Sequence, residues 1–262
     1  MKQVALITGA SSGIGRAAAE LFSRRGYTVY AAARNRDALE ALASDSVHPV
    51  SLDVTDDASM QACVQQVLDA EGRIDVLVNN AGYGSHGATE DVPMAEARRQ
   101  MDVNLFGLAR MIQLVLPPMR KAASGRIINI ASMGGRVWTP FASWYIASKF
   151  AVEGLSACLR LEEKPFGIDV VVIEPGGVET PWGEIAVQHL RDASQNGAYA
   201  AAAERTAARL AKTYAGRHLT KPEKIAKCIV KAAAVKHPRT RYLLGFGAKP
   251  LVYIQKVLGD RA

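Results

Sequence analysis

The sequence contains only three cysteines, Cys63, Cys158 and Cys228, and no Cys-x-x-Cys pair. This excludes a disulfide-stapled fold and indicates a reducing compartment. No apolar run reaches the roughly 18 residues that would span a bilayer. The apolar stretch from 4 to 7 is too brief for a signal peptide and runs directly into a glycine-rich loop. We therefore expect a cytoplasmic protein without a transmembrane segment.

The sequence also lacks a Pro/Ser-rich linker and any internal repeat. Its 22 glycines follow no period of three, and 49% of its residues are apolar, which excludes collagen and intrinsic disorder. At one domain per roughly 150 residues, the length allows one domain or two. Without a linker, we predict a single dinucleotide-binding catalytic domain over residues 1–262.

Positive charge is concentrated at the C-terminal end. The net charge is +7, and residues 217–262 contain eleven basic against two acidic residues. Nucleic acid is disfavoured as a partner because this basic extension has no recognition motif and no stacking aromatics among its lysines. A helix is expected to begin near Pro222, with one face formed by Lys224, Lys227 and Lys231. Its apolar side, with Ile225, Cys228 and Ile229, would cover a sheet. Farther along, Leu251, Val252, Ile254, Val257 and Leu258 lie among Lys249, Lys256 and Arg261, which would suit subunit contact or weak association with an anionic membrane.

Short apolar runs alternate with longer segments of helical period. The runs are 4–7, 27–32, 76–78, 127–130 and 170–173. Strands buried on both faces have continuous apolar sequences, so the pattern predicts an α/β fold: a Rossmann-like, doubly wound parallel sheet with helices on both faces. An Ala-rich stretch near 181–216 predicts one or two helices inserted after the sixth strand, over the ligand crevice.

The first expected strand ends in a glycine-rich loop, Thr8-Gly9-Ala10-Ser11-Ser12-Gly13-Ile14-Gly15, followed directly by a helical pattern. Glycines there allow a tight turn and close approach of a pyrophosphate to the positive end of the helix. Three glycines alone also fit a plain turn, and the loop lacks the Gly-Lys-Ser/Thr of a P-loop. We expect the segment from Gly9 to Gly15, with Ser11, Ser12, Gly13 and Ile14, to bind a dinucleotide.

No acidic residue stands at the end of the second expected strand, where an NAD site places a carboxylate on the ribose 2′-hydroxyl. The chain has Ala33-Arg34-Asn35 there. A guanidinium can form charge-assisted hydrogen bonds with a 2′-phosphate, so Arg34 predicts NADP(H) rather than NAD(H). A solvated arginine at a strand end, with an NAD(H)-using enzyme, is the alternative.

A catalytic group is indicated by Tyr145 and Lys149, which are four residues apart and share a helix face. A tyrosine titrates near 10 in isolation, so acid–base work near neutrality needs a nearby positive charge such as Lys149. Ser132 follows the run 127–130 and should lie at the carboxyl edge of the sheet. A surface Tyr/Lys pair is the alternative for the motif alone.

Several motifs occur together in order: Thr8-Gly9-x3-Gly13-x-Gly15, Asn79-Asn80-Ala81-Gly82, Asn104, Ser132, Tyr145-x3-Lys149 and Pro175-Gly176-x-Val178-x-Thr180. Together they resemble the compact single-domain short-chain dehydrogenase/reductases, whose members exchange hydride between a nicotinamide and a ketone or secondary alcohol. The resemblance implies that Tyr145 is the general acid/base and that Ser132 orients the reacting oxygen. It also implies that Lys149 binds the ribose and lowers the pKa of Tyr145. Asn104 would hold a water for proton relay, although an isolated Asn there more often kinks or caps a helix.

The same resemblance implies the cofactor contacts. Asp53 and Val54, ending the third strand, would face the adenine. Asn80, Ala81 and Gly82 would lie under the cofactor, with Asn79 tying strands together. The nicotinamide would meet Pro175, Gly176, Val178 and Thr180. No His/Cys cluster has metal-ligand spacing, so we expect no metal site.

The substrate side is indicated by aromatic residues that we expect to border the crevice. These are Tyr83, Trp138, Phe141, Trp144 and Trp182, with Pro140. They predict a bulky apolar ketone or alcohol, and the sequence is similar to family members acting on steroids, retinoids and lipid-like ketones. His86 could touch substrate, although a lone loop histidine is usually solvated.

Two further expectations complete the sequence-based view. Helices near 100–120 and 145–165 would pair subunits, so a homodimer or homotetramer is expected from the family resemblance. A non-catalytic NADP-binding redox sensor is the competing class, but such a sensor has no need of Asn104, Ser132, Tyr145 and Lys149 together.

Overall fold

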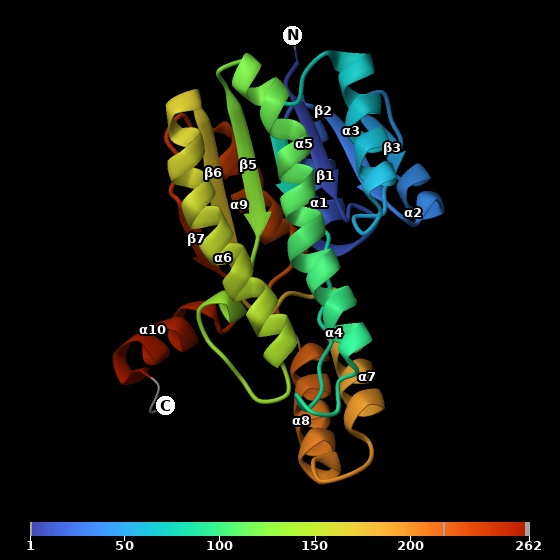
Figure 1. Ribbon diagram of the computed structural model, residues 1–262, viewed down its shortest axis with the longest axis vertical. Coiled ribbons are helices and arrows are strands. Elements are labelled where there is room, and N and C mark those ends of the chain that lie inside the picture. Colours follow the sequence, from blue (N-terminus) through green and yellow to red (C-terminus); the bar gives the residue numbers. More distant parts are fainter. Residues whose placement is uncertain (1, 217, 260–262) are drawn as a thin grey trace.

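A seven-stranded parallel sheet forms the centre of the protein, in a computed structural model that describes residues 2–216 and 218–259 (Figure 1). The strand order is β3-β2-β1-β4-β5-β6-β7, and every neighbouring pair is parallel. The strands are β1 (Val4–Thr8), β2 (Thr28–Ala33), β3 (Val47–Ser51), β4 (Val76–Asn79), β5 (Gly125–Ile130), β6 (Ile168–Pro175) and β7 (Arg241–Leu244). The five apolar runs therefore correspond to β1, β2, β4, β5 and β6, and the predicted fold class is confirmed.

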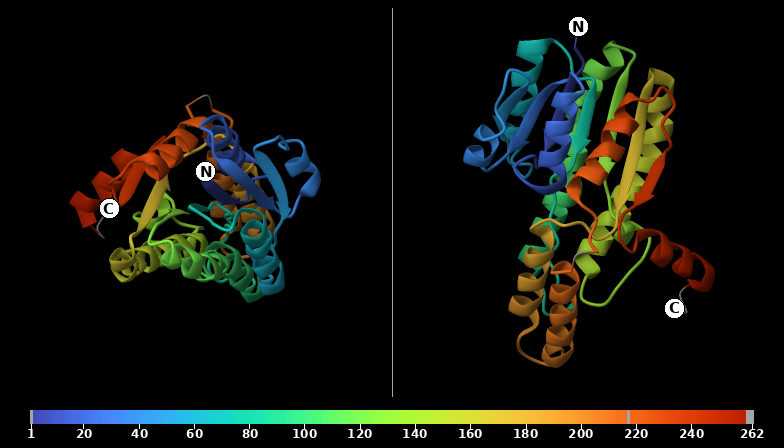
Figure 2. Two further views of the ribbon diagram at one scale, coloured as in Figure 1. Left: turned by 90° about the horizontal axis from the view of Figure 1, so that it is seen from above. Right: turned by 180° about the vertical axis from the view of Figure 1, so that it is seen from behind.

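Helices cover both faces of this sheet, as the view from above shows (Figure 2). One face packs against α3 (Asp57–Glu71), α5 (Leu108–Lys121) and α6 (Ser143–Glu163). The other packs against α1 (Gly13–Arg24) and α9 (Pro222–Ala234), with the short α2 (Arg36–Glu40) near β3. Because both faces are covered, the side chains of inner strands such as β1 and β6 are buried without alternation, as the continuous apolar runs predict.

The chain reverses its direction of travel across the sheet between β1 and β4. β1 pairs with β2 on one side and with β4 on the other, so Ile7 lies opposite both Ala31 and Val78. The loops that follow these strands diverge at the carboxyl edge and leave a crevice, the usual ligand position in open α/β sheets. Beside the crevice, α4 (Met94–Met101) continues through a π-helical turn (Asp102–Gly107) into α5.

The predicted insertion is a pair of helices, α7 (Trp182–Ser194) and α8 (Ala200–Tyr214). In Figure 1 they form a hairpin beyond the carboxyl ends of the strands. A small apolar cluster of Val187, Leu190, Ala203 and Ala207, with Phe141 packed against it, holds the pair together. The hairpin therefore has an apolar contact region separate from the two layers that cover the sheet.

The C-terminal segment contains α9, β7 and α10 (Ala248–Leu258). In α9, Ile225 and Ile229 are fully buried while the lysines are exposed, which confirms the predicted outer helix. α10 projects away from the sheet (Figure 2) and exposes Leu251, Ile254, Val257 and Leu258, whereas Val252 is buried. Arg261, predicted to flank this helix, lies outside the described residues. Within the described ranges, no helix combines the length and hydropathy that a membrane span needs.

Candidate active site

A cavity of about 990 Å³ opens at the carboxyl ends of the strands. The lining includes the predicted residues Gly9, Ser11, Ser12, Gly13, Ile14, Arg34, Asp53, Val54, Asn80, Ala81, Gly82, Ser132, Tyr145, Lys149, Pro175, Gly176, Val178 and Thr180. Gly15 and Asn104 stand behind this lining. Residues that are far apart in the sequence thus meet at one site, on the edge that the strand pattern indicates.

The glycine-rich loop joins β1 to the first turn of α1. Gly9 and Gly13 have φ values of +65° and +52°, a backbone region that favours glycine. α1 begins at Gly13, and its N-cap Ser12 makes no side-chain capping bond to the first turn. The loop therefore offers free backbone N–H groups at the positive end of a helix, a suitable site for a pyrophosphate.

Gly15 has a packing role in this loop. A Cβ at Gly15 would lie 2.4 Å from the Gly9 carbonyl oxygen and 2.5 Å from Nδ2 of Asn80. That Asn80 amide donates hydrogen bonds to the carbonyl oxygens of Thr8 and Gly9, at 3.0 and 3.1 Å. Gly15 thus allows Asn80 to clamp the phosphate loop to the segment after β4, a contact that a dinucleotide-binding pattern alone does not reveal.

Asn79 holds the strands beneath the cavity, as predicted. Its amide donates to Oδ1 of Asn129 at 3.0 Å, and the Asn129 amide donates to the Ser156 hydroxyl at 2.9 Å. This buried chain connects β4, β5 and α6. It fixes the position of α6, which carries Tyr145 and Lys149.

Ser132, Tyr145 and Lys149 come together at the inner end of the cavity. Ser132 follows β5, and its hydroxyl accepts a hydrogen bond from the backbone N–H of Gly134 at 3.0 Å, in a 3₁₀ turn (Met133–Gly135). Tyr145 and Lys149 lie in the first two turns of α6. The Lys149 ammonium donates to the Ile130 carbonyl at 2.9 Å and lies 5.8 Å from the centre of the Tyr145 ring. The constellation expected from the motif spacing is present.

Burial sets the protonation of this group. It raises the pKa of Tyr145 to about 12, and a hydrogen bond with Ser132 opposes this rise only in part. Burial also lowers the pKa of Lys149 to about 8. Desolvation of the phenolate outweighs the Ser132 hydrogen bond, and the lowering of the Tyr145 pKa by Lys149 stays a prediction. At neutral pH, Tyr145 is therefore protonated.

Asn104 acts as a connector within the π-helical turn. Its Oδ1 accepts from the Tyr83 backbone N–H at 3.0 Å, and its amide donates to the Tyr83 carbonyl at 2.9 Å and the Ser148 hydroxyl at 3.1 Å. The side chain is fully buried. Asn104 thus ties the loop after β4 to α6 beside Lys149, and the side-chain amide is occupied by these contacts.

The far end of the cavity contains Arg34, Asp53 and Val54. Asp53 and Val54 were expected to end the third strand. β3 instead ends at Ser51, so both residues lie in the loop beyond it. Both the backbone N–H and the hydroxyl of Thr55 donate to Oδ1 of Asp53. Burial raises the pKa of Asp53, but the Thr55 hydrogen bonds and the charges of Arg34 and Arg99 lower it below its usual value.

Arg99 is a lining residue that the sequence analysis missed. It lies on α4, and its charge acts on Asp53 together with that of Arg34. Arg34 follows β2 and Arg99 lies on α4, so only the fold brings both residues to this cavity. No local motif around Arg99 indicates this.

Behind the nicotinamide-binding motif, Glu174 makes structural contacts. It is 2% exposed and accepts from Arg136 at 3.0 Å, while the neighbouring Glu153 accepts from Arg241 at 2.8 Å. Burial and the repulsion of Glu153 raise the pKa of Glu174 well above its usual range.

The substrate side differs from the sequence-based expectation. Of the predicted aromatics, Tyr83 and Trp182 line the cavity, whereas Trp138, Phe141 and Trp144, like Pro140, do not. Trp138 points outward and is 45% exposed, and Phe141 packs against the α7–α8 cluster. Leu210 and Tyr214 of α8 line the cavity in their place. The loop histidine His86 is buried rather than solvated, and it lines the cavity beside Tyr145.

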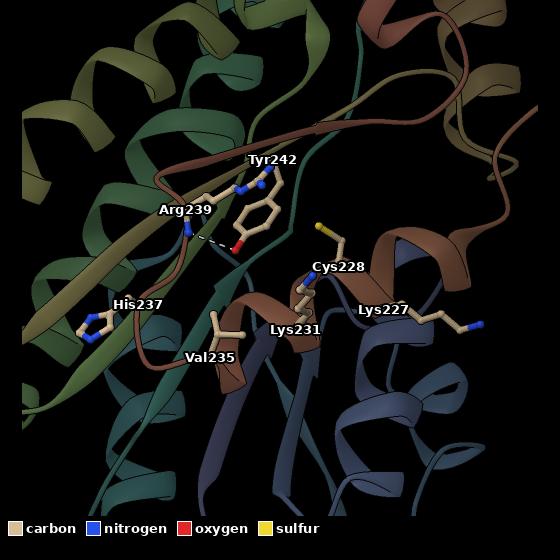
Figure 3. A pocket seen from close by; sticks show the side chains of 7 residues that line it. All are labelled: Lys227, Cys228, Lys231, Val235, His237, Arg239 and Tyr242. Carbon is tan, nitrogen blue, oxygen red and sulfur yellow. Dashed lines mark hydrogen bonds between the residues drawn. The ribbon is translucent and has the colours of Figure 1, made fainter.

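A second, smaller cavity of about 450 Å³ lies between α9 and the segment leading into β7 (Figure 3). Its lining residues are Lys227, Cys228, Lys231, Val235, His237, Arg239 and Tyr242, and the Arg239 backbone N–H donates to the Tyr242 hydroxyl at 3.1 Å. None of the predicted catalytic or cofactor-binding residues lines it. Part of the basic extension thus gathers here, away from the active site.

This fold, with a glycine-rich loop and the cluster of Ser132, Tyr145 and Lys149 at one cavity, is typical of a dinucleotide-binding protein, and comparison with known proteins agrees with this class. The model of the short chain dehydrogenase family matches residues 3–191. The 3-ketodihydrosphingosine reductase of Bacteroides thetaiotaomicron is 39% identical, over 96% of this chain and 90% of that protein. The chain therefore belongs to the short-chain dehydrogenase/reductase family, and it is an NAD(P)-dependent oxidoreductase acting on carbonyl or alcohol groups.

Solved structures show the same fold with either cofactor. A short-chain dehydrogenase from Streptomyces avermitilis superposes with a TM-score of 0.86 and 35% identity, over 99% of this chain and 95% of that one. A serine dehydrogenase complexed with NADP⁺ gives a TM-score of 0.82 and 25% identity, over 93% and 94%. A family member from Burkholderia phymatum, in complex with NAD, gives 0.83 and 26%, over 99% and 93%. The choice of cofactor therefore depends on the residues of this chain.

Proposed function

We propose that this protein is an NADP(H)-dependent oxidoreductase that interconverts a bulky, apolar ketone and its secondary alcohol, with Tyr145 as general acid/base. The observation that carries the proposal is the convergence of Ser132, Tyr145 and Lys149 in a cavity that the phosphate loop also lines. A nicotinamide bound there would supply or accept the hydride. The protein residues would bind, orient and exchange the proton.

The proton chemistry follows from the protonation states. Tyr145, with a pKa of about 12, carries its proton at neutral pH and can give it to a carbonyl oxygen that becomes basic during reduction. Ser132, beside the phenol, would hydrogen-bond the same oxygen. Lys149 would hold the nicotinamide ribose. In the alcohol-oxidising direction Tyr145 must lose its proton, and the positive charge of the oxidised cofactor would favour this.

The remaining cofactor contacts fit the residues present. The N–H groups from Gly13 onward would hold the pyrophosphate, with Ser11, Ser12 and Ile14 beside it, and Gly9 allows close approach. Asp53 and Val54 would face the adenine, and Asn80, Ala81 and Gly82 would lie under the cofactor. Pro175, Gly176, Val178 and Thr180 would meet the nicotinamide.

Charge at the adenosine end supports NADP(H) over NAD(H). Arg34 is exposed at the mouth of the cavity, directly after β2, and Arg99 contributes a second positive charge nearby. Asp53 feels the charge of both arginines, and its Oδ1 is held by Thr55. A 2′-phosphate would therefore meet two guanidiniums, and its charge would be favoured over a bare hydroxyl.

Apolar side chains from the inserted helices support a bulky apolar substrate. Trp182 and Ile185 of α7 and Leu210 and Tyr214 of α8 line the cavity opposite the phosphate loop. The Trp182 ring lies 5.1 Å from the Tyr145 ring and 5.8 Å from Tyr214. The related reductase is named for a long-chain lipid ketone. A lipid-like ketone is the substrate class that fits this wall.

The deciding experiment compares the wild type with Tyr145→Phe on a panel of ketones and alcohols, followed by nicotinamide absorbance with both cofactors. We expect turnover to fall at least 100-fold in the variant, because general acid–base catalysis contributes roughly 10²–10⁴-fold, while NADPH still binds. The phenyl ring keeps the packing against Trp182, so folding is preserved. Retained turnover would refute the mechanism, and an inactive wild type that binds NADPH would favour the redox-sensor alternative.

Four properties of the whole protein remain proposals. These are a single catalytic domain over 1–262, a homodimer or homotetramer, a cytoplasmic location, and weak contact of α10 with an anionic membrane. The exposed apolar residues of α10, flanked by Lys249 and Lys256, support either of the last helix's predicted roles, subunit or membrane contact.

A further inference from the structure

His86 lies at the centre of an aromatic wall next to the reacting group. Its ring stacks on Tyr145, with centroids 5.9 Å apart and planes 29° apart, and meets Trp182 edge-on at 5.5 Å. The residue is 6% exposed and lines the cavity. A polar ring therefore stands where the surrounding wall offers apolar contacts.

The fold leaves a nitrogen of this ring without a partner among the described residues. Nδ1 is buried, and no residue that the structure describes makes a hydrogen bond of normal geometry to it. A hydrogen bond with the Gly84 backbone nevertheless raises the pKa of the ring. No described residue hydrogen-bonds to Nε2 either, and Nε2 is not among the fully buried side-chain atoms. Buried polar groups are normally paired. The accessible nitrogen of a ring that lines a cavity is therefore available to a ligand in that cavity.

The ring is uncharged under ordinary conditions. Burial lowers the pKa of His86 to about 4; a hydrogen bond with the Gly84 backbone opposes this in part, and the charge of His189 adds to the lowering. A neutral imidazole has one donor and one acceptor nitrogen. It thus matches a neutral hydroxyl group, which can both donate and accept, better than it matches a carboxylate or a phosphate.

The loop that carries His86 is fixed on both sides. Asn104 holds both backbone groups of Tyr83, and the Ser85 hydroxyl hydrogen-bonds to His189 of α7 at 3.0 Å. The Gly87 backbone N–H donates to the Phe141 carbonyl at 2.9 Å, and that of Ala88 donates to the Ser194 hydroxyl at 2.9 Å. A polar group held by such supports is pre-organised for recognition.

We propose that His86 is a specificity-determining residue that binds a hydroxyl group on the α- or β-carbon of the ketone substrate. The placement follows from the stacking of His86 on Tyr145, with ring centroids 5.9 Å apart, because rings this close would contact neighbouring parts of one substrate. The proposal rests on the proposed function. It narrows the substrate class from an apolar ketone to a hydroxyketone with an apolar chain.

The test uses two long-chain ketones that are identical except for an α-hydroxyl group, with a β-hydroxyketone as the third member. The wild type should show a kcat/KM about tenfold higher for a hydroxyketone than for the parent ketone, the factor that about 1.4 kcal/mol produces. In His86→Phe, which keeps an aromatic ring but has no nitrogen, this ratio should fall to about one. In His86→Gln, whose amide donates and accepts, part of the preference should return.

Leu210→Ala provides the matched control on the same cavity wall. It removes apolar contact without removing a hydrogen-bonding group, so it should lower kcat/KM for both ketones alike and leave their ratio unchanged. If His86→Phe lowers both ketones alike, or leaves the ratio as in the wild type, His86 is a packing residue and the proposal is wrong. A wild type without preference for either hydroxyketone also overturns it.

A binding measurement separates this proposal from the proposed function. Calorimetry of each ketone with the NADP⁺-loaded protein needs no turnover. If no ketone is turned over but the hydroxyketone still binds about tenfold more tightly than its parent, and His86→Phe abolishes the difference, the proposed function fails and the His86 site stands. If the ketones are reduced but neither Kd nor kcat/KM responds to His86→Phe, the His86 site fails alone.

Discussion

The strongest test of cofactor choice is the removal or reversal of charge at Arg34. The guanidinium stands at the end of β2, at the cavity mouth. A hydrogen bond to a charged group contributes about 1.5–3 kcal/mol. Because Arg34 is exposed, the lower end of that range applies. Arg34→Ala should therefore reduce the ratio of kcat/KM for NADPH to kcat/KM for NADH by about tenfold.

Reversal of the charge should have a larger effect. A carboxylate facing the 2′-phosphate adds repulsion of about 1 kcal/mol for each pair of unit charges at 4 Å in water. Together with the lost hydrogen bond, this predicts that Arg34→Asp lowers the NADPH/NADH ratio by roughly 100-fold or more. The carboxylate can also accept from the ribose hydroxyls of NADH, so the activity with NADH should be preserved or rise.

Arg36→Asp is the matched control, because Arg36 is exposed, lies two positions farther along and pairs with Glu40 at 3.2 Å, away from the cavity lining. If the surface charge acted only at long range, both Asp variants would change the ratio, and the effect would weaken at high salt, since the Debye length is about 10 Å at 0.1 M. We expect Arg36→Asp to change the ratio little. The interpretation of Arg34 is wrong if Arg34→Ala leaves the ratio unchanged, or if the two Asp variants behave alike.

Two further predictions concern stability, measured by urea unfolding. Gly15→Ala places a Cβ 2.4 Å from the Gly9 carbonyl and should lower the free energy of unfolding by about 1–3 kcal/mol. Gly154→Ala is the control, because Gly154 lies in α6 with no atom within 4 Å of an added Cβ, and it should raise this free energy. Equal effects of the two variants would contradict the packing role of Gly15. The pKa of Glu174 is raised above 4.5, the ordinary value for a glutamate, so folding takes up a proton. The free energy of unfolding of the wild type should therefore fall as the pH rises from 4.5 through neutrality. Glu174→Gln resembles the protonated form and should match the wild type at pH 5 but exceed it at pH 8, on the order of 2 kcal/mol; a constant difference between the two would refute this.

The sheet and the cofactor side of the site could be predicted because their signals are local. Continuous apolar runs such as 170–173 are typical of strands in a covered sheet, and a glycine-rich loop between a strand and a helix has few other uses. The spacing of Tyr145 and Lys149 fixes a shared helix face wherever the helix lies. These features depend on backbone geometry, which short sequence patterns determine.

The packing role of Gly15 and the position of Arg99 could not be predicted in the same way. Whether a Cβ fits at Gly15 depends on Asn80, 65 positions farther along the chain, and on how closely two loops approach. Arg34 and Arg99 line the same cavity and both act on Asp53, although 65 positions separate them in the sequence. Both depend on distances between elements, and a residue pattern within one element contains no such information.

The substrate wall shows a more general limit, because its composition depends on which way each side chain points. Trp138 and Trp144 lie within seven residues of Tyr145, yet neither lines the cavity, whereas Tyr214 of α8 does. A cofactor common to many reactions needs backbone groups at fixed positions, which motifs can specify. A particular substrate is instead contacted by side chains of inserted helices and of the loop after β4. Within that loop, His86 lies four positions after Gly82 and places its one polar ring against Tyr145. In this protein, the residues that we propose to determine substrate choice therefore lie beside the family motifs and not within them.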